Sequence, residues 1–455
     1  MPPCPVRTSR RTRRRTGSRW SCRQVIDEEG FTCGELTCCG QRQAATRTDR
    51  RFPVSGCPVL SADEALSVAE DLAAGFAIGA AARDRQRDLP YAEVARLSAS
   101  GLLAVTVPRE YGGADLAPSV VTEIIRLIAA ADPNIAQIPH SHFVYVNLLR
   151  LAGSPEQLGL YSRHLLAGAR IANAQAERGG PTAADVATTL RPSHEGFRID
   201  GTKYYCTGSL FADFLAVLTR LDDPDRISGL PDGQYVAFLP ADTEGVRIID
   251  DWNGMGQRTT ASGTIEFDAV EVERCQLVPR AGAVNAPTGY GAFAQIMHAA
   301  IDAGIARGAL EAAADFARNT SRPWFEAEVA RAIDDPLLVQ RFGELSVTVR
   351  GAEAALSVAA AHVDAAMGDH AGAENAAEAS LAVATAKALA DTAANEVAGA
   401  LFEVTGTRST AADLNLDHFW RNARTHTVHD PVRWKYQHLG RALLHGTPPP
   451  LHPAI

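Results

Sequence analysis

Between residues 58 and 170, hydrophobic residues recur three and four positions apart, the spacing that places them on one face of a helix. Ser61 and Glu64 form the capping sequence S-x-x-E, which predicts a helix from Ser61 to about Arg83. Pro90 is expected to begin a second helix that ends at Gly101. Further helices are expected at 118–130, 143–151 and 155–166. Residues 58–170 therefore predict an N-terminal helical domain.

From residue 171 the pattern changes to short runs of β-branched and aromatic residues, separated by Gly, Pro and Asp. Runs of this length and spacing are typical of the strands of a β-barrel or sandwich. They lie at 171–177, 186–192, 197–208, 214–220, 234–240, 246–250 and 263–272. The segment 171–284 is therefore expected to be a central β domain.

After about Gly289 the helical pattern returns and continues towards the end of the sequence. Three long Ala-rich segments lie at 291–318, 336–368 and 372–402. Because small side chains let helices pack closely, residues 285–455 predict an antiparallel helical bundle with a surface suited to a homodimer or homotetramer. The order of helical, β and helical domains makes the expected fold class α+β multidomain.

The composition is that of a soluble globular protein, with 46% hydrophobic and 21% charged residues. A chain of 455 residues exceeds one ordinary core and is expected to form two or three domains. The net charge of −9 argues against a nucleic-acid-binding protein. No apolar run reaches the roughly 18 to 20 residues that a membrane span requires, so no membrane partner is expected.

Residues 1–57 differ from the rest of the chain: they hold twelve Arg and five acidic residues, which leaves −16 for the remaining residues. Without hydrophobic periodicity this segment is expected to be a disordered extension, and it lacks the apolar stretch of a secretory signal. A transit peptide, a start codon placed too early and a poorly spaced zinc module of Cys33, Cys38 and Cys39 remain open. Beyond it only Cys206 and Cys275 occur, which fits a reducing cytoplasm.

The sequence RTHTVHDPV near the C-terminus combines two imidazoles and a carboxylate beside a proline. His426 and His429 are three positions apart and share a helical face, while Pro431 disfavours helical geometry at Asp430. A helix end or tight turn that presents all three titratable groups is therefore expected, with a plain polar helix edge as the alternative. A Zn or Fe(II) site would need further ligands that are not spaced nearby, so no metal is expected.

Four segments, in this order, resemble motifs of the acyl-CoA dehydrogenase superfamily: GLLAVTVPREYGG (101–113), ANAQAERGG (172–180), GTKYYCTG (201–208) and WNGMGQRTTASGTIEFDAV (252–270). The resemblance extends from about residue 60 to 445. RTHTVHDPV and SRPWFEAEVARAIDDP (321–336) resemble the flavin-dependent monooxygenase branch, which includes dibenzothiophene monooxygenase and sulfur-acquisition oxidoreductases. Common acyl-CoA dehydrogenases remove a proton with a glutamate in a Y-E-G-T turn. Asp430 falls at that position, is one methylene shorter and precedes a proline, which favours the monooxygenase branch.

The resemblance implies a flavin held between the β domain and the C-terminal bundle. Reduced FMN is expected from the monooxygenase branch, and FAD from the wider superfamily. Arg322 is expected to bind a phosphate, in a flavin of a neighbouring subunit, because a guanidinium fork suits phosphate. The full set of implied flavin contacts is Asn173, Gln175, Arg178, Lys203, Thr207, Arg322, Thr407, Arg408, His426 and His429.

Hydroxylation with reduced flavin and O2 requires a site that excludes water and donates hydrogen bonds to the bound oxygen. The resemblance makes His429 and Thr207 the expected donors, beside Asp430 in the catalytic turn. His142 resembles the branch's active-site histidine, and it borders the expected substrate pocket together with Trp252. The alternatives are structural: a strand hydroxyl for Thr207, a core ring for Trp252 and a buried helix histidine for His142. His140 and His438 are expected to be structural.

Three functions are compatible with this resemblance. The first is a two-component monooxygenase that receives reduced flavin from a separate reductase and oxidises a small organosulfur compound. The chain carries no nicotinamide fingerprint, because GMGQRT (254–259) lacks the third glycine of that motif. The second function is an acyl-CoA dehydrogenase with bound FAD, and the third is a catalytically silent oligomeric scaffold. Asp430 and the H-T-V-H-D turn favour the first.

Overall fold

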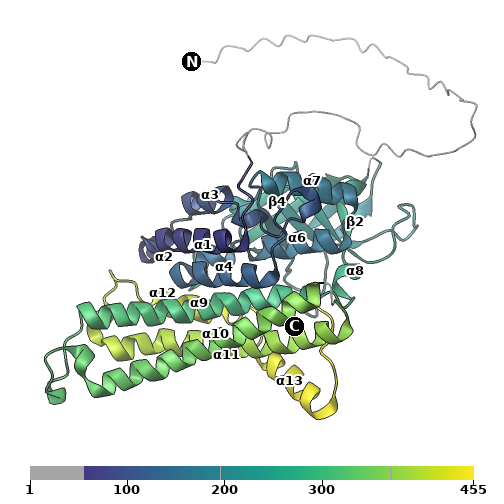
Figure 1. Cartoon of the computed structure of the whole chain (residues 1–455). Coiled ribbons are helices and arrows are strands. Elements are labelled where there is room, and N and C mark those ends of the chain that lie inside the picture. The colour runs from purple at the N-terminus through teal and green to yellow at the C-terminus, as the bar shows by residue number, and fades with distance from the viewer. Residues whose placement is uncertain (1–55, 195, 369–370) are drawn as a thin grey trace, which may run out of the picture. The chain divides into compact units, whose positions relative to one another are not determined.

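The computed structural model of the protein describes residues 56–194, 196–368 and 371–455 (Figure 1). The Arg-rich extension, with Cys33, Cys38 and Cys39, lies outside these residues except for its last two positions. Of those two, Cys57 belongs to the folded body, because its N–H donates to the Leu166 carbonyl at 2.8 Å.

The N-terminal helices begin at the expected capping box, in which the Ser61 hydroxyl accepts the N–H of Glu64 and the Glu64 carboxylate accepts the N–H of Ser61. The prediction of one continuous helix from Ser61 to about Arg83 is wrong. Gly79 has φ 81°, a left-handed conformation, and it separates α1 (Ala62–Ala77) from α2 (Ala80–Gln86). The helices that follow are α3 (Tyr91–Ala99), α4 (Pro118–Ala131), α5 (Pro133–Gln137), α6 (His140–Ala152) and α7 (Pro155–Leu166).

The central segment forms one mixed sheet of eight strands, in the order β6-β7-β3-β2-β4-β5-β8, with β1 paired to β4. β1 and β2 run parallel to β4, and the other neighbours are antiparallel. The strand bounds are β1 (Ile171–Ala174), β2 (Thr189–Pro192), β3 (Phe197–Cys206), β4 (Phe214–Leu221), β5 (Gln234–Pro240), β6 (Val246–Ile249), β7 (Gly263–Val272) and β8 (Leu277–Pro279). The sheet has a hydrophobic core of its own, built around Ile199, Val217 and Ile265.

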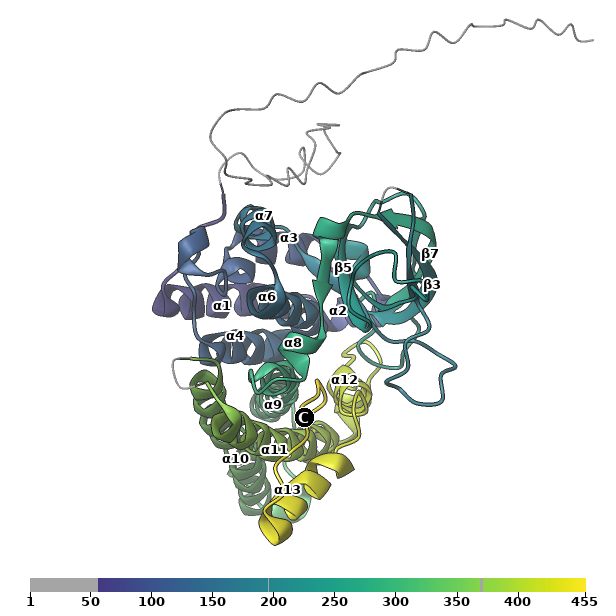
Figure 2. The same ribbon diagram turned by 90° about the vertical axis from the view of Figure 1, so that its right-hand side faces the viewer.

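The C-terminal part contains the three expected long helices, and Figure 2 shows α9 between α4 and α11. Gly308 on α9 permits a close approach to α4, because a Cβ at this position would lie 2.2 Å from the Ala130 carbonyl oxygen. The N-terminal helices and the bundle consequently share one hydrophobic core. The bounds are α8 (Ala281–Val284), α9 (Tyr290–Asn319), α10 (Pro336–Met367), α11 (Ala373–Thr405), α12 (His418–His426) and α13 (Arg433–His445).

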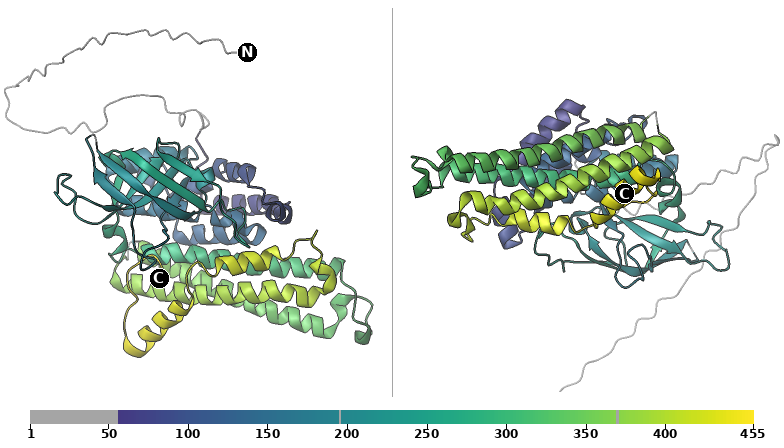
Figure 3. Two further views of the ribbon diagram at one scale, coloured as in Figure 1. Left: turned by 180° about the vertical axis from the view of Figure 1, so that it is seen from behind. Right: turned by 90° about the horizontal axis from the view of Figure 1, so that it is seen from below.

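The sheet, the N-terminal helices and the bundle meet beside α12, which Figure 3 shows below the sheet. Gly256, in the loop before β7, packs directly on this helix, since an added Cβ would lie 1.9 Å from the Arg421 carbonyl oxygen. In the described ranges, no single helix is long and apolar enough to cross a membrane. The bent pair of α1 and α2 has that length and composition when the two are combined.

Candidate active site

The expected turn lies between α12, which ends at His426, and α13, which begins at Arg433. His426 is buried, the His429 side chain is half exposed, and Asp430 is largely buried. Pro431 cannot continue the helix hydrogen bonding, and its carbonyl accepts the N–H of Trp434 as the next helix starts. A helix therefore ends at the predicted position, but only His429 of the three groups is substantially exposed, and the role of the turn in a site stays a prediction.

Two further histidines join this turn and form a histidine cluster of His140, His298, His426 and His429. The ring centroid of His298, on α9, lies 4.2 Å from that of His429 and 4.0 Å from that of His140 at the start of α6. Its Nδ1 lies 3.0 Å from Nε2 of His426. Burial lowers the pKa of His140 to about 4 and holds the pKa values of His298 and His426 well below the usual range. These three rings are therefore neutral at pH 7.

Behind the histidine cluster, two carboxyl groups and a lysine form a buried network. Nδ1 of His426 lies 2.5 Å from Oδ1 of Asp302, and Oδ2 of Asp302 accepts a hydrogen bond from Nζ of Lys387 at 2.8 Å. Lys387 also pairs with Asp391, one turn further along α11. Burial raises the pKa of Asp302, while burial and the Asp302 charge raise the pKa of Asp391 to about 8. The protonation of each carboxyl group therefore depends on the charge of the other and on that of Lys387.

Asp430 is committed to an ion pair. Its Oδ2 lies 2.9 Å from Nζ of Lys435 on α13, and the side chain of this lysine is 2% exposed. Burial raises the pKa of Asp430, but the His429 imidazole, whose Nδ1 lies 3.5 Å from Oδ1, and the charges of Lys435 and Lys387 bring it well below its usual range. A carboxylate of such low basicity is a poor acceptor for a proton bound to carbon.

A path of hydrogen bonds connects the sheet to α12. The Thr207 hydroxyl, just after β3, lies 2.8 Å from that of Ser262, which lies 2.6 Å from that of Thr260. The Thr260 hydroxyl donates to the Gln257 carbonyl, and the Gln257 N–H donates to the Asn422 side chain at 2.6 Å. Asn422 lies one turn before the end of α12. The predicted Thr207 and the histidine cluster therefore belong to the same junction of domains.

The residues around this junction fit a polar ligand such as a flavin. Four of them carry buried polar atoms without a hydrogen-bond partner among the described residues: the side-chain oxygen of Asn173 on β1, both amide atoms of Gln257, and the hydroxyls of Thr259 and Thr425. Each such atom costs roughly 1–3 kcal/mol if it stays unpaired. The polar edge of an isoalloxazine ring and a ribityl chain offer the donors and acceptors that these atoms lack.

Two of the predicted flavin contacts are engaged with protein groups instead. Lys203 is fully buried, and its Nζ donates to the Glu177 carboxylate at 2.6 Å and to the Gln175 carbonyl at 3.1 Å. The side-chain oxygen of Gln175 accepts the Tyr145 hydroxyl at 2.9 Å. Burial lowers the pKa of Lys203, and the Glu177 carboxylate opposes this shift. Lys203 therefore holds the loop after β1 in place and does not itself reach a ligand.

Arg178 and Trp252 lie around an aromatic pair beside this loop. The Arg178 side chain is exposed, and its guanidinium carbon lies 4.3 Å from the ring centroid of Tyr204 and 4.9 Å from that of Tyr205. Trp252 stands edge-on to Tyr205, with centroids 6.2 Å apart, and its indole N–H donates to the Gln257 carbonyl at 2.7 Å. Trp252 thus borders the loop that carries the unpaired Gln257 amide, and its place in a substrate pocket stays a prediction.

His142, predicted as a catalytic and substrate-pocket residue, has the surroundings of the structural alternative, a buried helix histidine. Its Nε2 lies 2.8 Å from the Leu103 carbonyl and its Nδ1 accepts the Ile171 N–H at 3.2 Å, so both ring nitrogens bind backbone groups. Burial lowers the pKa of His142 to about 4. His140, which was expected to be structural, joins the histidine cluster in its place. His426 also has both nitrogens engaged and is 1% exposed, so it supports the cluster and does not contact a flavin directly.

Arg322, Thr407 and Arg408 lie at the other end of the bundle. Arg408 donates to the Thr320 carbonyl at 2.6 Å, just beyond the end of α9, and Arg322 is exposed in the following loop. Because a helix rises 1.5 Å per residue, this end of α9 is roughly 33 Å from His298. These three residues therefore cannot complete the junction beside the histidine cluster of their own chain, and they are free to contact a second copy.

His298, Asp302, Lys387 and Asp391 were not predicted as site residues. Each is surrounded by mainly apolar neighbours in an Ala-rich helix, so no local motif marks it. A weaker signal existed, because His298 and Asp302, like Lys387 and Asp391, are four positions apart and share a helical face. In the described ranges, no group of three or more His, Cys, Asp and Glu side chains is arranged to hold a metal ion.

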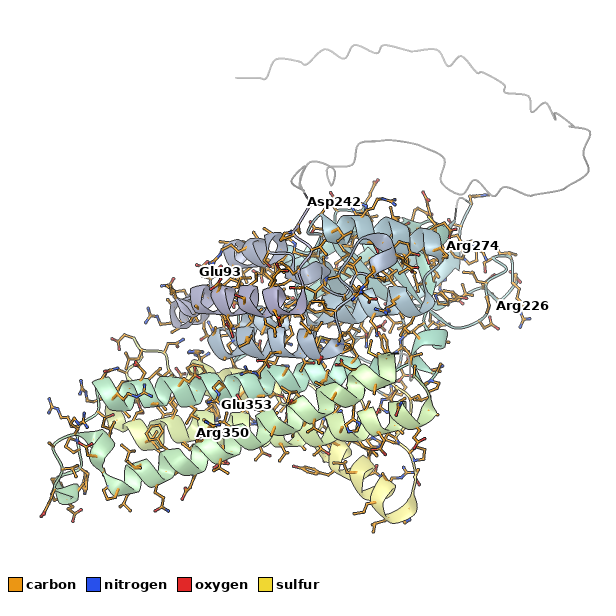
Figure 4. The ribbon with its side chains drawn as sticks, in the orientation of Figure 1. Glu93, Arg226, Asp242, Arg274, Arg350 and Glu353 are labelled. Atoms are coloured by element: carbon orange, nitrogen blue, oxygen red, sulfur yellow. The ribbon has the colours of Figure 1, made fainter. Side chains whose placement is uncertain are left out.

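A cavity of about 1020 Å³ lies apart from these residues, between α1, α4, α9 and α10. Its polar wall includes Glu353, labelled in Figure 4, which pairs with Arg126 of α4 and Arg307 of α9. A smaller cavity of about 210 Å³ lies beside Asn147 and Phe293. Neither is lined by a member of the histidine cluster.

Comparison with known proteins identifies close counterparts of this architecture. Sequence models of the acyl-CoA dehydrogenase N-terminal, middle and C-terminal domains match residues 64–169, 173–270 and 296–434. Dibenzothiophene monooxygenase of Rhodococcus qingshengii is 33% identical over 398 residues, which cover 85% of this chain and 94% of that protein. The probable FMNH2-dependent monooxygenase SfnC of Pseudomonas putida is 32% identical over 392 residues, covering 85% and 96%.

Solved structures show the same relationship. FMN-bound TdsC of Paenibacillus sp. A11-2 superposes with a TM-score of 0.80 at 31% identity, covering 86% of this chain and 100% of that one. Methanesulfinate monooxygenase MsuC of Pseudomonas fluorescens gives a TM-score of 0.79 at 31% identity, covering 86% and 99%. The chain belongs to the acyl-CoA dehydrogenase superfamily, in the branch that contains dibenzothiophene monooxygenase.

Proposed function

We propose that this protein is the oxygenase of a two-component monooxygenase, which uses reduced FMN and O2 to oxidise a small organosulfur compound. The observation that carries the proposal is the pairing of Asp430 with buried Lys435, directly beside half-exposed His429. This turn offers the His429 imidazole to a ligand, while the charge of its carboxylate is compensated by Lys435. The similarity to dibenzothiophene monooxygenase, SfnC and MsuC supports the same chemistry.

The dehydrogenase alternative requires a base that removes a proton from carbon. The Asp430 side chain is one methylene shorter than the glutamate of common acyl-CoA dehydrogenases, and its charge is committed to Lys435. A scaffold without a cofactor is also a poorer explanation. It would leave the buried polar atoms of Asn173 and Gln257 without partners and gain nothing in return.

Reduced FMN, when bound, supplies the two electrons that activate O2. Asn173 and Gln257 would bind its polar edge with atoms that otherwise lack partners. Thr207 reaches the same region through its hydroxyl chain. His429 would donate a hydrogen bond to the activated oxygen, because its half-exposed side chain is the part of the histidine cluster open to a ligand. The neutral rings of partly buried His140 and buried His298 would limit the access of water to this position.

The remaining partners follow from the same proposal. FMN is favoured over FAD by the FMN-bound structure of TdsC and by the FMNH2-dependent relative, and use of free reduced flavin requires a separate reductase. Exposed Arg322 supports a homodimer or homotetramer in which one copy binds the flavin phosphate of its neighbour. A cytoplasmic location is supported by Cys57, Cys206 and Cys275, which form no disulfide in the described part of the chain.

The test is oxygenation with and without a reductase. The purified protein is mixed with NADH, FMN and either dibenzothiophene or methanesulfinate, and a purified flavin reductase is added to half of the samples. We expect oxygenated product only in the samples that contain the reductase. Product formed with NADH and no reductase would remove the two-component arrangement. If the protein oxidised an acyl-CoA anaerobically with an artificial electron acceptor, its activity would be that of a dehydrogenase and the monooxygenase proposal would fail.

A further inference from the structure

We propose that Asp302, His426 and His298 form a proton relay that determines which nitrogen of His298 carries a proton. All three side chains are at most 2% exposed. Two short contacts join them: Asp302 Oδ1 to His426 Nδ1 at 2.5 Å, and His426 Nε2 to His298 Nδ1 at 3.0 Å. The inference rests on the proposed function only for the reaction that the relay serves, since the order of protons follows from these contacts.

Lys387 determines the direction of the hydrogen bonds. Its ammonium group donates to Oδ2 of Asp302 at 2.8 Å, and its positive charge favours the ionised carboxylate, so Asp302 is the acceptor towards His426. Nδ1 of His426 then carries a proton, which leaves Nε2 of the same neutral ring as an acceptor. That nitrogen receives the Nδ1 proton of His298. Nε2 of His298 is therefore unprotonated, with its lone pair free to accept a proton.

The unprotonated Nε2 of His298 is available to the proposed flavin site. None of the residues in the described ranges forms a hydrogen bond to Nε2 of His298. The ring lies against half-exposed His429, which belongs to the turn that faces the ligand. His298 thus stands between the open part of the histidine cluster and the carboxylate buried in the bundle. Asp302 and His426 are positioning residues, because they act through His298.

A proton that enters at Nε2 of His298 is balanced along the relay. The Nδ1 proton of His298 passes to Nε2 of His426, and the Nδ1 proton of His426 passes to Asp302. Every hydrogen bond is kept with its direction reversed, no electron moves, and one proton has moved from the site into the bundle. The reverse sequence returns it. Reactions that consume and release protons at a bound oxygen would use both directions.

Charged and titratable groups surround the relay on every side. His140 on α6 and His429 in the turn face His298, and Lys387 faces both His298 and His426. Asp391 and Asp430 act on Asp302, and Lys387 opposes the rise in the pKa of Asp302 that burial causes. Because the Lys387 cation lies at the carboxylate end of the relay, the resting state places the negative charge on Asp302 and keeps the imidazoles of His298 and His426 neutral.

Asp302→Asn is expected to reverse both tautomers. Lys387 is a donor, so it will hold the amide oxygen, and the amide NH2 will point at Nδ1 of His426. His426 must then carry its proton on Nε2 and donate to Nδ1 of His298, which places a proton on Nε2 of His298. Asp391→Asn is the matched control. It removes the other carboxylate bound to Lys387 but leaves the contact between Asp302 and His426 intact.

The tautomers are measured in flavin-free protein by solid-state NMR after labelling with 15N-histidine. Protonated and bare ring nitrogens have separate shifts, and His298→Gln and His426→Gln identify the two rings among the 13 histidines. We expect the wild type and Asp391→Asn to show Nδ1–H tautomers at both rings, and Asp302→Asn to show Nε2–H at both. With reductase and FMN present, Asp302→Asn should also lose product formation by roughly 10²- to 10⁴-fold, the range of general acid–base catalysis.

The wild-type spectrum alone can overturn the relay: an Nε2–H tautomer at His298 would reverse the assigned order, even if Asp302→Asn failed to fold. Unchanged tautomers in folded Asp302→Asn, or the same reversal in Asp391→Asn, would also end the proposal. The reductase experiment and this one fail independently. If the protein proved to be a dehydrogenase and Asp302→Asn reversed the tautomers, the relay would stand and the monooxygenase proposal would fail. If the protein were an active monooxygenase and Asp302→Asn left the tautomers unchanged, the monooxygenase proposal would stand and the relay would fail.

Discussion

Replacing Lys387 with Met tests whether the buried network of the bundle is held together by charge. The Lys387 side chain is 1% exposed, its Nζ lies 2.8 Å from Oδ2 of Asp302, and it also pairs with Asp391. Met keeps most of the apolar stem of the lysine but removes the ammonium group. The two carboxyl groups would then lie in an Ala-rich interior without a cation.

The expected loss can be worked from these contacts. At 2.8 Å and an effective dielectric constant of 20, one ion pair is worth roughly 6 kcal/mol, and the desolvation of the lysine offsets part of it. Removal of one partner from a buried pair costs about 3–5 kcal/mol, and we expect this decrease in the free energy of unfolding at pH 8.

The loss should depend on pH in a defined direction. The pKa of Asp391 is already raised to about 8 in the folded protein, and it rises further without Lys387. Folded Lys387→Met therefore binds more protons than the folded wild type, and its deficit shrinks as the pH falls from 8 to 6. Each additional proton bound by the folded variant reduces the deficit by about 1.4 kcal/mol per pH unit.

Urea unfolding of flavin-free protein at pH 6, 7 and 8, followed by tryptophan fluorescence, measures this deficit. The protein concentration is kept fixed because the stability of an oligomer depends on it. Lys387→Met/Asp391→Asn is the control: it removes one of the two uncompensated carboxylates and should recover part of the loss. A deficit below about 1 kcal/mol, the value for exposed pairs, or one that does not change with pH would refute the argument.

Two further predictions concern the proposed flavin site. His429→Ala should bind reduced FMN with unchanged affinity but release H2O2 in place of product, because the activated oxygen loses its hydrogen-bond donor; oxygen consumption that still matches product formation would count against it. Arg322→Ala should weaken FMN binding at least tenfold in a titration without changing the melting temperature, since the exposed guanidinium is expected to hold the phosphate of a neighbouring copy. Arg331→Ala, in the same loop and similarly exposed, should leave the affinity unchanged, and equal losses in both variants would exclude a specific contact.

The fold was predictable where an element has its own start and stop signals. Strands β5 and β7 and helix α7 lie at the expected bounds, and α7 is preceded by a capping residue and begins with Pro155. Gly79 lies inside the first predicted helix, and its left-handed conformation ends the helix there. Strand β8 and helix α5 were missed because three to five residues are too few to produce a recognisable period.

The site was predictable only in its local part. His426, His429 and Asp430 are adjacent in sequence, so the turn could be inferred from spacing. His298 is 128 positions from His426, and their contact depends on how α9 packs against α12. The choice between His140 and His142 required the rotation of α6 as well. Two positions turn a helix by about 200°, so His140 and His142 lie on nearly opposite faces of α6, and the sequence does not say which face meets α9 and which meets β1.

The buried network is better explained by proton placement than by stability. Ala-rich helices such as α9 and α11 already pack closely, and apolar residues in place of a buried ion pair are often neutral or stabilising. An apolar core at Asp302, Lys387 and Asp391 would therefore serve folding at least as well. It would leave His426 without the acceptor that holds a proton on its Nδ1, and both tautomers in the chain from Asp302 to His298 would become free to exchange. The charged residues inside the bundle thus provide a fixed order of protons beneath the turn that faces the ligand, and this order requires Asp302 to be ionised next to Lys387.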